Sequence, residues 1–259
     1  MKQPLAYIHP DVKIHRSVII DPFVCIEENV EIGEGTRIGS NVTICEGTRI
    51  GKNCTIFPGA VVGAIPQDLK FKGEESLAII GDNTVIREFV TVHRGTASRG
   101  KTIVGSNCLI MAYSHIAHDC IVGNNVIMSN ATQLAGEVVI GDYAVIGGGT
   151  LVHQFSHIGA HVMIQGGSRI NKDIPPFITA ARDPIQYCGV NSIGLRRRGY
   201  SSQQIQAIQD VYRLIYQSGL NVTQAMEKVE TELPSSQERD EVILFVRNSP
   251  RGICKGIDI

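Results

Sequence analysis

The sequence predicts a mainly β protein, in which a parallel β-helix of hexapeptide repeats is followed by a small α-helical domain. From Ile8 to Ile170, 25 of the 28 residues spaced six apart are aliphatic. A period of six is a multiple of the strand period of two and not of the helical period of about 3.6, so these residues share one face of extended chain. The residue two places before each of the 25 is always Ala, Val, Thr, Cys or Ser. Hexapeptide periods of this kind are typical of a parallel β-helix.

Each pair of a large aliphatic and a small residue is expected to point into a narrow, stacked core. Glycine often follows the aliphatic residue, as Gly33 and Gly105 do, where the backbone has to turn sharply without a Cβ atom. Three hexads make one triangular coil of eighteen residues, so residues eighteen apart are expected to stack on successive coils. Their spacing is then about 4.8 Å, the ordinary distance between neighbouring strands.

Three positions break the series, and each lies in a polar stretch. Asp68 and Glu74 fall within residues 63–78, and Ser98 falls within residues 93–102. Both stretches are predicted to be insertions that leave the β-helix as loops. Solenoid proteins commonly carry their chemistry on such loops and on their outer faces.

The hexads stop after Ile170, and the sequence that follows, Asp173-Ile174-Pro175-Pro176, is hostile to a helix. An irregular link is predicted as far as Gly199. Ser201 and Gln204 then have the spacing of a capping box, which predicts a helix that ends near Gly219.

Two further helices are predicted at about 221–233 and 236–248, with Ser235 and Glu238 as a second cap. We therefore assign residues 1–190 to the β-helix and residues 191–259 to a helical domain. A β-helix has to hide its open end, so the helical tail is expected at least to cover the last coil.

Composition excludes several classes of protein. The net charge of −1 gives no sign of nucleic-acid binding, and no apolar segment is long enough for a transmembrane helix. The first residues, Met1 to Pro4, lack the apolar run of a signal peptide, so we expect none. The seven cysteines lack the paired spacing of a metal site, and we expect reduced thiols in a cytoplasmic protein. Three of the cysteines occupy small core positions: Cys54, Cys108 and Cys120.

A line of polar residues is predicted along one outer edge of the β-helix. His118 lies just past a corner, so its side chain should point away from the core, and it should stack with Gly136 and then Gln154. Two steps of the coil give this line a length of about 10 Å, which suits part of a nucleotide sugar. A histidine beside a free backbone amide suits acyl transfer, because the imidazole takes a proton and the amide stabilises an oxyanion. Asp119 is a candidate for orienting the ring, although adjacent side chains on extended chain diverge.

A metal site is the alternative that these histidines suggest. His118, His153 and His157 loosely resemble the zinc ligands of β-helical carbonic anhydrases. Ligands two coils apart should differ by thirty-six positions, whereas His118 and His153 differ by thirty-five, so their side chains start from different registers. We therefore expect no metal.

Several motifs together resemble a known family, the bacterial acyl-carrier-protein–UDP-N-acetylglucosamine O-acyltransferases, which open lipid A biosynthesis. The resemblance spans essentially the whole chain, the helical tail included. The motifs that carry it are Gln67-Asp68-Leu69-Lys70, His93-Arg94-Gly95-Thr96, Ala112-Tyr113-Ser114-His115-Ile116-Ala117-His118-Asp119-Cys120, His153-Gln154-Phe155, Gly159-Ala160-His161-Val162-Met163 and Gly189-Val190-Asn191.

The resemblance implies a left-handed β-helix, a homotrimer with its sites between neighbouring β-helices, and specific roles for residues. His118 corresponds to the general base that deprotonates the 3-hydroxyl of glucosamine, Asp119 to its supporting acid, and Gly136 to the amide that stabilises the oxyanion. Gly166 corresponds to the position that limits the length of the acyl chain. Residues implied to bind substrate are Gln67, Asp68, Lys70, His115, His153, Gln154, Asn191, Arg197 and Arg198. The partners implied are UDP-N-acetylglucosamine and an acyl carrier protein, whose phosphopantetheine makes a dissociable cofactor unnecessary.

Two positions depart from the family pattern. The family usually has histidine after Gly136, where this chain has Glu137, and the family glutamate near Asn191 is replaced by Ile193. Glu137 is therefore expected to contact the acceptor sugar, and a 3-amino sugar nucleotide that would give an amide stays open as the acceptor.

Three other functions stay open as alternatives. One is the N-acyltransferase that acts later in the same pathway, although it carries an extra N-terminal domain and the hexads here begin at Ile8. Another is a coenzyme A-dependent acetyltransferase. The third is a β-helical scaffold without activity, which the presence of His118, Asp68 and Lys70 disfavours.

Overall fold

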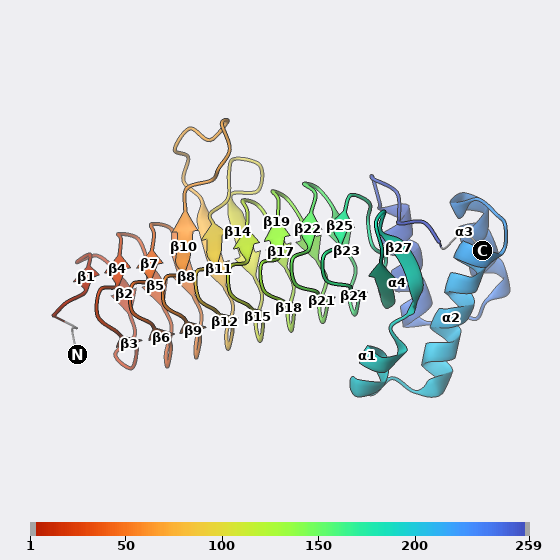
Figure 1. Ribbon diagram of the computed structural model, residues 1–259, viewed down its shortest axis with the longest axis horizontal. Coiled ribbons are helices and arrows are strands. Elements are labelled where there is room, and N and C mark those ends of the chain that lie inside the picture. The colour runs from red at the N-terminus through yellow and green to blue at the C-terminus, as the bar shows by residue number, and fades with distance from the viewer. Residues whose placement is uncertain (1–3, 257–259) are drawn as a thin grey trace.

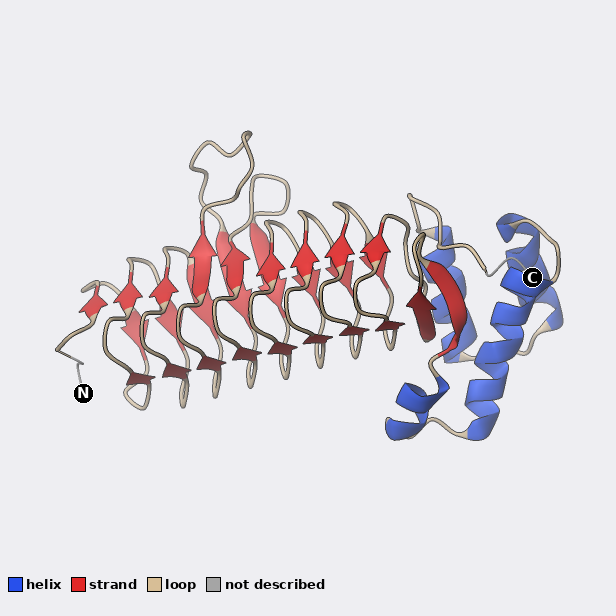
Figure 2. Cartoon of the chain, in the orientation of Figure 1, coloured by secondary structure: helices blue, strands red, loops and turns tan. Residues whose placement is uncertain are grey.

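The computed structural model describes residues 4–256, which form a left-handed parallel β-helix with a group of helices packed at its C-terminal end (Figure 1). The predicted fold class is confirmed. Residues 1–3 and 257–259, the outer ends of the two predicted domains, lie outside the described part of the chain. The strands are short and fall into three rows, one on each face of a triangular prism (Figure 2).

Each row of strands is a hydrogen-bonded sheet, which we name A, B or C. Sheet A has nine strands: β1 (Tyr7–Ile8), β4 (Cys25–Ile26), β7 (Thr43–Ile44), β10 (Val61–Ala64), β13 (Thr91–His93), β16 (His115–Ile116), β19 (Gln133–Leu134), β22 (Leu151–Val152) and β25 (Arg169–Ile170). Sheet B has eight strands: β2 (Lys13–Ile14), β5 (Glu31–Ile32), β8 (Thr48–Ile50), β11 (Leu77–Ile80), β14 (Lys101–Val104), β17 (Ile121–Val122), β20 (Val139–Ile140) and β23 (His157–Ile158). Sheet C has ten strands: β3 (Ile19–Ile20), β6 (Arg37–Ile38), β9 (Thr55–Ile56), β12 (Val85–Ile86), β15 (Leu109–Ile110), β18 (Ile127–Met128), β21 (Val145–Ile146), β24 (Met163–Ile164), β26 (Ile178–Ala181) and β27 (Gln186–Val190).

The register of the sheets follows the predicted coil of three hexads. In sheet B, Ile121 pairs with Val139, eighteen residues further along the chain. The interval is longer only where an insertion intervenes, as between Val62 and Val92 in sheet A. Parallel pairing continues coil after coil because every strand presents the same face to the interior.

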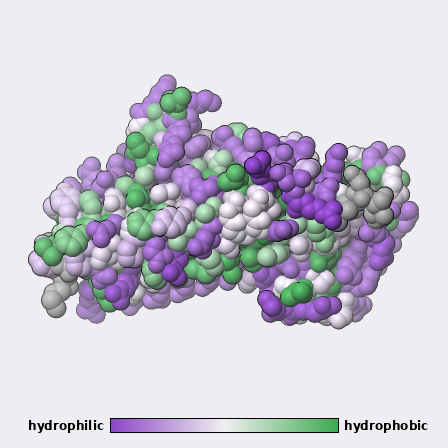
Figure 3. Space-filling view, viewed as in Figure 1, coloured by the Kyte–Doolittle hydropathy of each residue, from purple (hydrophilic) through white to green (hydrophobic). Residues whose placement is uncertain are grey.

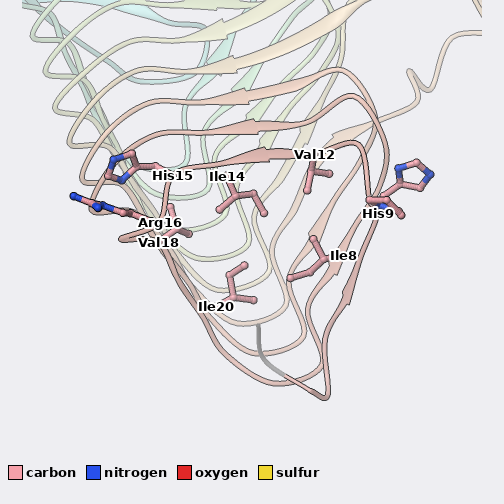
Figure 4. Close-up of a pocket in the computed structure, with 9 residues that line it drawn as sticks. Ile8, His9, Val12, Ile14, His15, Arg16, Val18 and Ile20 are labelled. Carbon is pink, nitrogen blue, oxygen red and sulfur yellow. The ribbon is translucent and has the colours of Figure 1, made fainter. Parts of the chain in front are cut away.

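The aliphatic residues of the hexads fill the interior of the prism. Ile26, Ile56 and Ile116 have at most 1% of their surface exposed, and Cys54, Cys108 and Cys120 are buried as predicted. Figure 4 looks into the first coils and shows two classes of side chain. Those directed inward are Ile8, Val12, Ile14, Val18 and Ile20, and those directed outward are His9, His15 and Arg16.

Two loops leave the β-helix at one edge, as Figures 1 and 2 show. The first loop, residues 65–76, connects β10 to β11, and the second loop, residues 94–100, connects β13 to β14. Both loops are shorter than the predicted insertions 63–78 and 93–102, because the strands on either side extend to three or four residues. The flanking strands belong to sheets A and B, so both loops emerge where the chain passes from sheet A to sheet B.

The link between the coils and the helices is more regular than predicted. Strands β26 and β27 form an antiparallel pair, and a short helix, α1 (Ser192–Arg197), follows them. The prediction of an irregular link as far as Gly199 is therefore wrong. The pairing of β26 with β24 continues sheet C past the last hexad, which the hexad period alone does not reveal.

The remaining helices are α2 (Ser202–Gln217), α3 (Val222–Glu232) and α4 (Gln237–Arg247). The predicted capping box of Ser201 and Gln204 is present at α2. The cap of α4 is Ser236, whose hydroxyl accepts a hydrogen bond from the N–H of Arg239 at 3.1 Å, and not Ser235 as predicted. The neighbouring serine bonds to a carboxylate of α4 instead.

The helices cover the last coil, as predicted. Tyr212 of α2 is fully buried, and its hydroxyl donates to the carbonyl of Pro176 at 2.5 Å. Phe177, the next residue along the chain, is also buried. Hydrophilic residues cover much of the face shown in Figure 3, with smaller hydrophobic patches between them. Within residues 4–256, no helix combines the length and the apolar character that crossing a bilayer requires.

Candidate active site

The prism has three edges, and the position of a corner residue in the coil of eighteen residues decides which edge it occupies. Edge AB, where the chain passes from sheet A to sheet B, contains residues 117–120, 135–138 and 153–156. Edge BC contains residues 141–144 and 159–162, and edge CA contains residues 147–150 and 165–168. Both loops leave the molecule at edge AB, so any site that they cover lies there.

His118 lies on edge AB in the wall of a cavity of about 380 Å³. Only 8% of the residue is exposed. The stacking predicted along this edge is present, because the carbonyl of His118 accepts the N–H of Glu137 at 2.9 Å, and that of Gly136 accepts the N–H of Phe155 at 3.1 Å. Polar residues and glycine that share this cavity are Gln67, His115, His118, Gln133, Gly136 and Gln154.

His118 and Asp119 form a hydrogen-bonded pair, with 2.8 Å between Nδ1 and Oδ2. Adjacent side chains diverge on extended chain, but Asp119 has a φ angle of 60°, in the left-handed region. This turn brings its carboxylate back beside the imidazole of the preceding residue. Aspartate tolerates that conformation better than most residues do.

The carboxylate of Asp119 has no exposed surface and accepts hydrogen bonds from the second loop. The N–H of Thr96 and the N–H of Arg99 donate to Oδ1 at 3.0 and 3.1 Å, and the hydroxyl of Thr96 donates to Oδ2. A buried carboxylate is tolerated when hydrogen bonds replace its lost hydration. Because its partners are donors, Asp119 acts as an acceptor toward His118. Nδ1 of His118 then carries a proton, and the lone pair is left on Nε2.

Gly136 lies directly against the free nitrogen of His118. A Cβ atom at residue 136 would come within 2.5 Å of Nε2, so glycine is required for this close approach. Within residues 4–256, no hydrogen bond of the structure uses the N–H of Gly136. A base nitrogen and a free backbone amide therefore lie beside one another at the cavity.

Two further histidines lie next to His118, and both have lowered pKa values. Burial, together with the neighbouring His115 and His118, lowers the pKa of His93 to about 4. Burial and the proximity of His118 also lower the pKa of His115, and its Nδ1 lies 2.6 Å from the hydroxyl of Thr91. The rings of His93 and His115 pack edge to face, with 4.8 Å between their centres.

The three residues of the first loop that were predicted to bind substrate lie in three different surroundings. Gln67 lines the cavity that holds His118. Lys70 lines a separate hollow between the two loops, together with Leu69, which is fully exposed. The carboxylate of Asp68 accepts the N–H of Lys70 at 3.0 Å and shapes the turn of the loop.

The predicted residues on the following coils are also only partly brought together. Gln154 lines the cavity, whereas His153 is exposed and contacts the carbonyl of Gln154 through Nδ1 at 2.9 Å. Glu137 lies beside the cavity wall and not in it, with Oε2 4.0 Å from Nε of Arg99. Glu137 has a φ angle of 61°, and we attribute its turn toward the second loop to this conformation.

The residues predicted to bind the nucleotide lie on another edge of the same chain. Asn191 uses both ends of its amide to fix α1, donating to the carbonyl of His161 at 2.9 Å and accepting from the N–H of Gly194 at 3.1 Å. Arg198 donates to the carbonyl of Tyr143 at 2.8 Å. His161 and Tyr143 belong to edge BC, so the structure does not bring these residues to the His118 cavity within one chain.

Arg197 and Gly166 complete the predicted set. Arg197 is exposed on α1. Gly166 lies on edge CA next to Gly148, whose carbonyl oxygen a Cβ atom at residue 166 would meet at 3.0 Å. Edge CA borders sheet A on the side opposite to His118, so the outer face of sheet A connects Gly166 with the cavity.

Sequence reasoning missed the residues that hold Asp119. The motif His93-Arg94-Gly95-Thr96 carries the family resemblance but gives no role to Thr96, and neither Arg99 nor Thr102 stands out in the sequence. The only available signal was the break of the series at Ser98, which placed a loop before the coil of His118. Within the described chain, no group of three or more His, Cys, Asp or Glu side chains is arranged to hold a metal ion.

Three family models match parts of the chain. A family model described as UDP-N-acetylglucosamine O-acyltransferase, domain 2, matches residues 173–254, and one described as bacterial transferase hexapeptide (six repeats) matches residues 101–136. A third, described as the GMPPB C-terminal domain, matches residues 2–103.

Individual relatives share much more of the chain. An acyl-acyl-carrier-protein–UDP-N-acetylglucosamine O-acyltransferase of Trichlorobacter lovleyi is 52% identical over 255 residues, which cover 97% of this chain and 98% of the relative. One of Chlorobium phaeobacteroides is 59% identical over 194 residues, or 74% of each chain. The crystal structure of a UDP-N-acetylglucosamine acyltransferase from Bacteroides fragilis, 57% identical, superposes with a TM-score of 0.97 and covers 98% of this chain and 100% of that one.

Proposed function

The chain belongs to the family of acyl-carrier-protein–UDP-N-acetylglucosamine O-acyltransferases, and we propose that His118 is the general base with which it acylates its sugar nucleotide. The reaction moves a 3-hydroxyacyl group from acyl carrier protein to the 3-hydroxyl of UDP-N-acetylglucosamine, the first step of lipid A biosynthesis. The observation that carries the proposal is the position of Nε2 of His118, oriented by Asp119, beside the unused amide of Gly136.

The bonds that form and break in acyl transfer match the positions of His118 and Gly136. Nε2 of His118 takes the proton of the 3-hydroxyl as its oxygen attacks the acyl carbon of the thioester. Negative charge develops on the carbonyl oxygen, and the N–H of Gly136 stabilises it. When the carbon–sulfur bond breaks, the imidazolium returns the proton to the departing thiolate. His93 and His115 have lowered pKa values, so we propose that His118 alone of the three carries the proton.

The acyl donor is an acyl carrier protein with its phosphopantetheine, and no resident cofactor takes part in the steps proposed here. The nucleophile is a hydroxyl of the sugar, so no cysteine or serine of the enzyme is acylated. We also propose a cytoplasmic location, in which the seven thiols stay reduced; all seven cysteines are free in the structure.

We propose further that the active unit is a homotrimer with each site between two copies. Support comes from the separation of the predicted residues on different edges: His118 lies on edge AB, whereas Asn191 and Arg198 are fixed to edge BC. The interfaces of a cyclic trimer join unlike surfaces, and we propose that edge AB of one copy faces edge BC of the next. The nucleotide then contacts α1 of one copy while its sugar reaches His118 of the neighbour.

The test is a transfer assay with purified protein, UDP-N-acetylglucosamine or its 3-amino analogue, and 3-hydroxyacyl carrier proteins of graded chain length. We expect acylation of the hydroxyl sugar and a loss of at least about 100-fold in kcat with His118→Ala. Equal activity after His118→Ala would contradict the proposed base. Preferential acylation of the 3-amino analogue would contradict the proposed acceptor.

A further inference from the structure

We propose that the second loop is a cradle for the carboxylate of Asp119, and that Thr96 is a positioning residue for acyl transfer. The inference deepens the proposed function and rests on it, because Thr96 acts only through Asp119 and His118. The loop, residues 94–100, is the shorter of the two that leave edge AB.

The donors of the loop converge on both oxygens of one carboxylate. The N–H groups of Thr96 and Arg99 meet at Oδ1, and the hydroxyl of Thr96 lies 2.6 Å from Oδ2. The same Oδ2 accepts Nδ1 of His118 at 2.8 Å. One oxygen is thus fixed by the loop backbone, and the other is shared between Thr96 and the catalytic ring.

This sharing sets the direction of the His118 ring. A carboxylate that is free to rotate would let the imidazole swing, whereas one held at both oxygens leaves it a single orientation toward Gly136. The N–H of Asp119 itself donates to the hydroxyl of Thr102 at 2.8 Å, so its backbone is held as well. A displacement of about 1 Å at a reacting group costs on the order of 100-fold in rate.

The loop is stiff enough to act as a cradle. It closes on itself through the N–H of Gly100 and the carbonyl of Thr96 at 2.7 Å. The hydroxyl of Ser76 donates to the carbonyl of Gly95 at 2.6 Å, and the carboxylate of Glu74 accepts the N–H of Ala97 at 2.9 Å. The first loop therefore braces the second one, and Thr96 is itself buried.

Arg99 connects the cradle to the next coil. Its Nη1 donates to the carbonyl of Asp119 at 3.0 Å, and its Nε lies 4.0 Å from the carboxylate of Glu137. Glu137 is thus the electrostatic partner of Arg99 in this chain.

Thr96→Val and Thr96→Ser make a matched pair for the test. Valine keeps the shape and the backbone N–H but removes the hydroxyl, whereas serine keeps the hydroxyl. We expect Thr96→Val to lower kcat about 10-fold or more with the KM of both substrates unchanged, since a hydrogen bond to a charged group is lost. Thr96→Ser should retain kcat within about twofold.

An Asp119→Ala background separates positioning from a general structural role. A residue that acts through Asp119 has nothing left to position there, so Thr96→Val should cause no further fall in kcat. If Thr96→Val does not fold, Thr96→Ala, which also removes the hydroxyl, replaces it, with an expected fall in kcat at unchanged KM. An unchanged kcat in the Thr96 variant that lacks the hydroxyl, or an equal fall in the Asp119→Ala background, would overturn the inference.

The two proposals fail in distinguishable ways. A wild-type protein that acylates no UDP-sugar would overturn the proposed function. A wild-type protein that is active and depends on His118, but is indifferent to Thr96→Val, would overturn the cradle alone.

Discussion

Nε2 of His118 lies 2.5 Å from the position that a Cβ atom on residue 136 would occupy, so any side chain there would clash with the imidazole. The base and the backbone beside it are therefore matched in shape. This contact explains the glycine without any appeal to an unusual backbone angle, and it gives the first prediction.

Gly136→Ala is expected to lower kcat by about 100-fold or more while the fold is kept. The added methyl group displaces the imidazole from the position in which it can take the proton of the hydroxyl. Steady-state rates and the thermal unfolding midpoint, measured on the same preparation, check this. A kcat within twofold of the wild type would show that the ring moves aside at no cost.

Subunit complementation tests the position of the site between copies. His118→Ala and Arg197→Ala should each be weakly active at low UDP-sugar concentration, and chains refolded or co-expressed together should regain activity. In a cyclic trimer of randomly mixed chains, about a quarter of the sites combine an intact His118 with an intact Arg197 from the neighbour. Recovery of about a quarter of the wild-type rate is expected, and no recovery would place both residues in one chain's site.

Gly166→Met is expected to shift the preference toward shorter acyl chains. The side chain would project at edge CA, where the neighbouring carbonyl of Gly148 already lies 3.0 Å from the Cβ position. The ratio of kcat/KM for short and long acyl carrier proteins measures the shift, with the KM for the sugar nucleotide as a control that should not change. An unaltered chain-length profile would remove Gly166 from the acyl site.

Acid should destabilise the protein partly through His93, whose pKa burial lowers from 6.5 to about 4. Between these values the unfolded chain binds a proton that the folded chain excludes, so the free energy of unfolding falls as the pH falls from 6.5 to 4. The contribution is on the order of 3 kcal/mol at most, from 1.36 kcal/mol per pKa unit.

The check is the free energy of unfolding at pH 7 and at pH 4, for the wild type and His93→Asn at one protein concentration. Asparagine does not titrate in this range, so the variant should lose less stability on acidification. An identical loss in both proteins would assign the acid sensitivity to other groups.

The periodicity of the sequence was sufficient to predict the coils, and with them the stacking of His118 on Gly136. Both depend on a repeat that every coil obeys. The pairing of His118 with Asp119 was not predictable with the same certainty, because it depends on one left-handed backbone angle at residue 119. The roles of Thr96 and Arg99 could not be predicted for a related reason. Their loop lies outside the hexad repeat, so the repeat does not say which residues they contact.

The helical tail shows another limit of the sequence. The three predicted helices are present, but strands β26 and β27 and the short α1 were missed. Asn191 and Arg198 were expected at the substrate site, whereas within one chain they hold α1 against His161 and Tyr143. Long-range contacts decide on which edge a helix packs, and these contacts produce no local pattern in the sequence.

Because the coils are regular, the distance along the axis between residues on different coils can change only in steps of one coil. Inserting or deleting one coil between His118 and Gly166 would change their separation along the axis by about 4.8 Å, the spacing of neighbouring strands. Every later residue would then stack on a different neighbour. Finer adjustment of an acyl pocket on this scaffold therefore has to come from side chains that block or open a fixed channel. We expect small residues such as Gly148 and Gly166 to be the positions at which the acyl preference of this scaffold is adjusted.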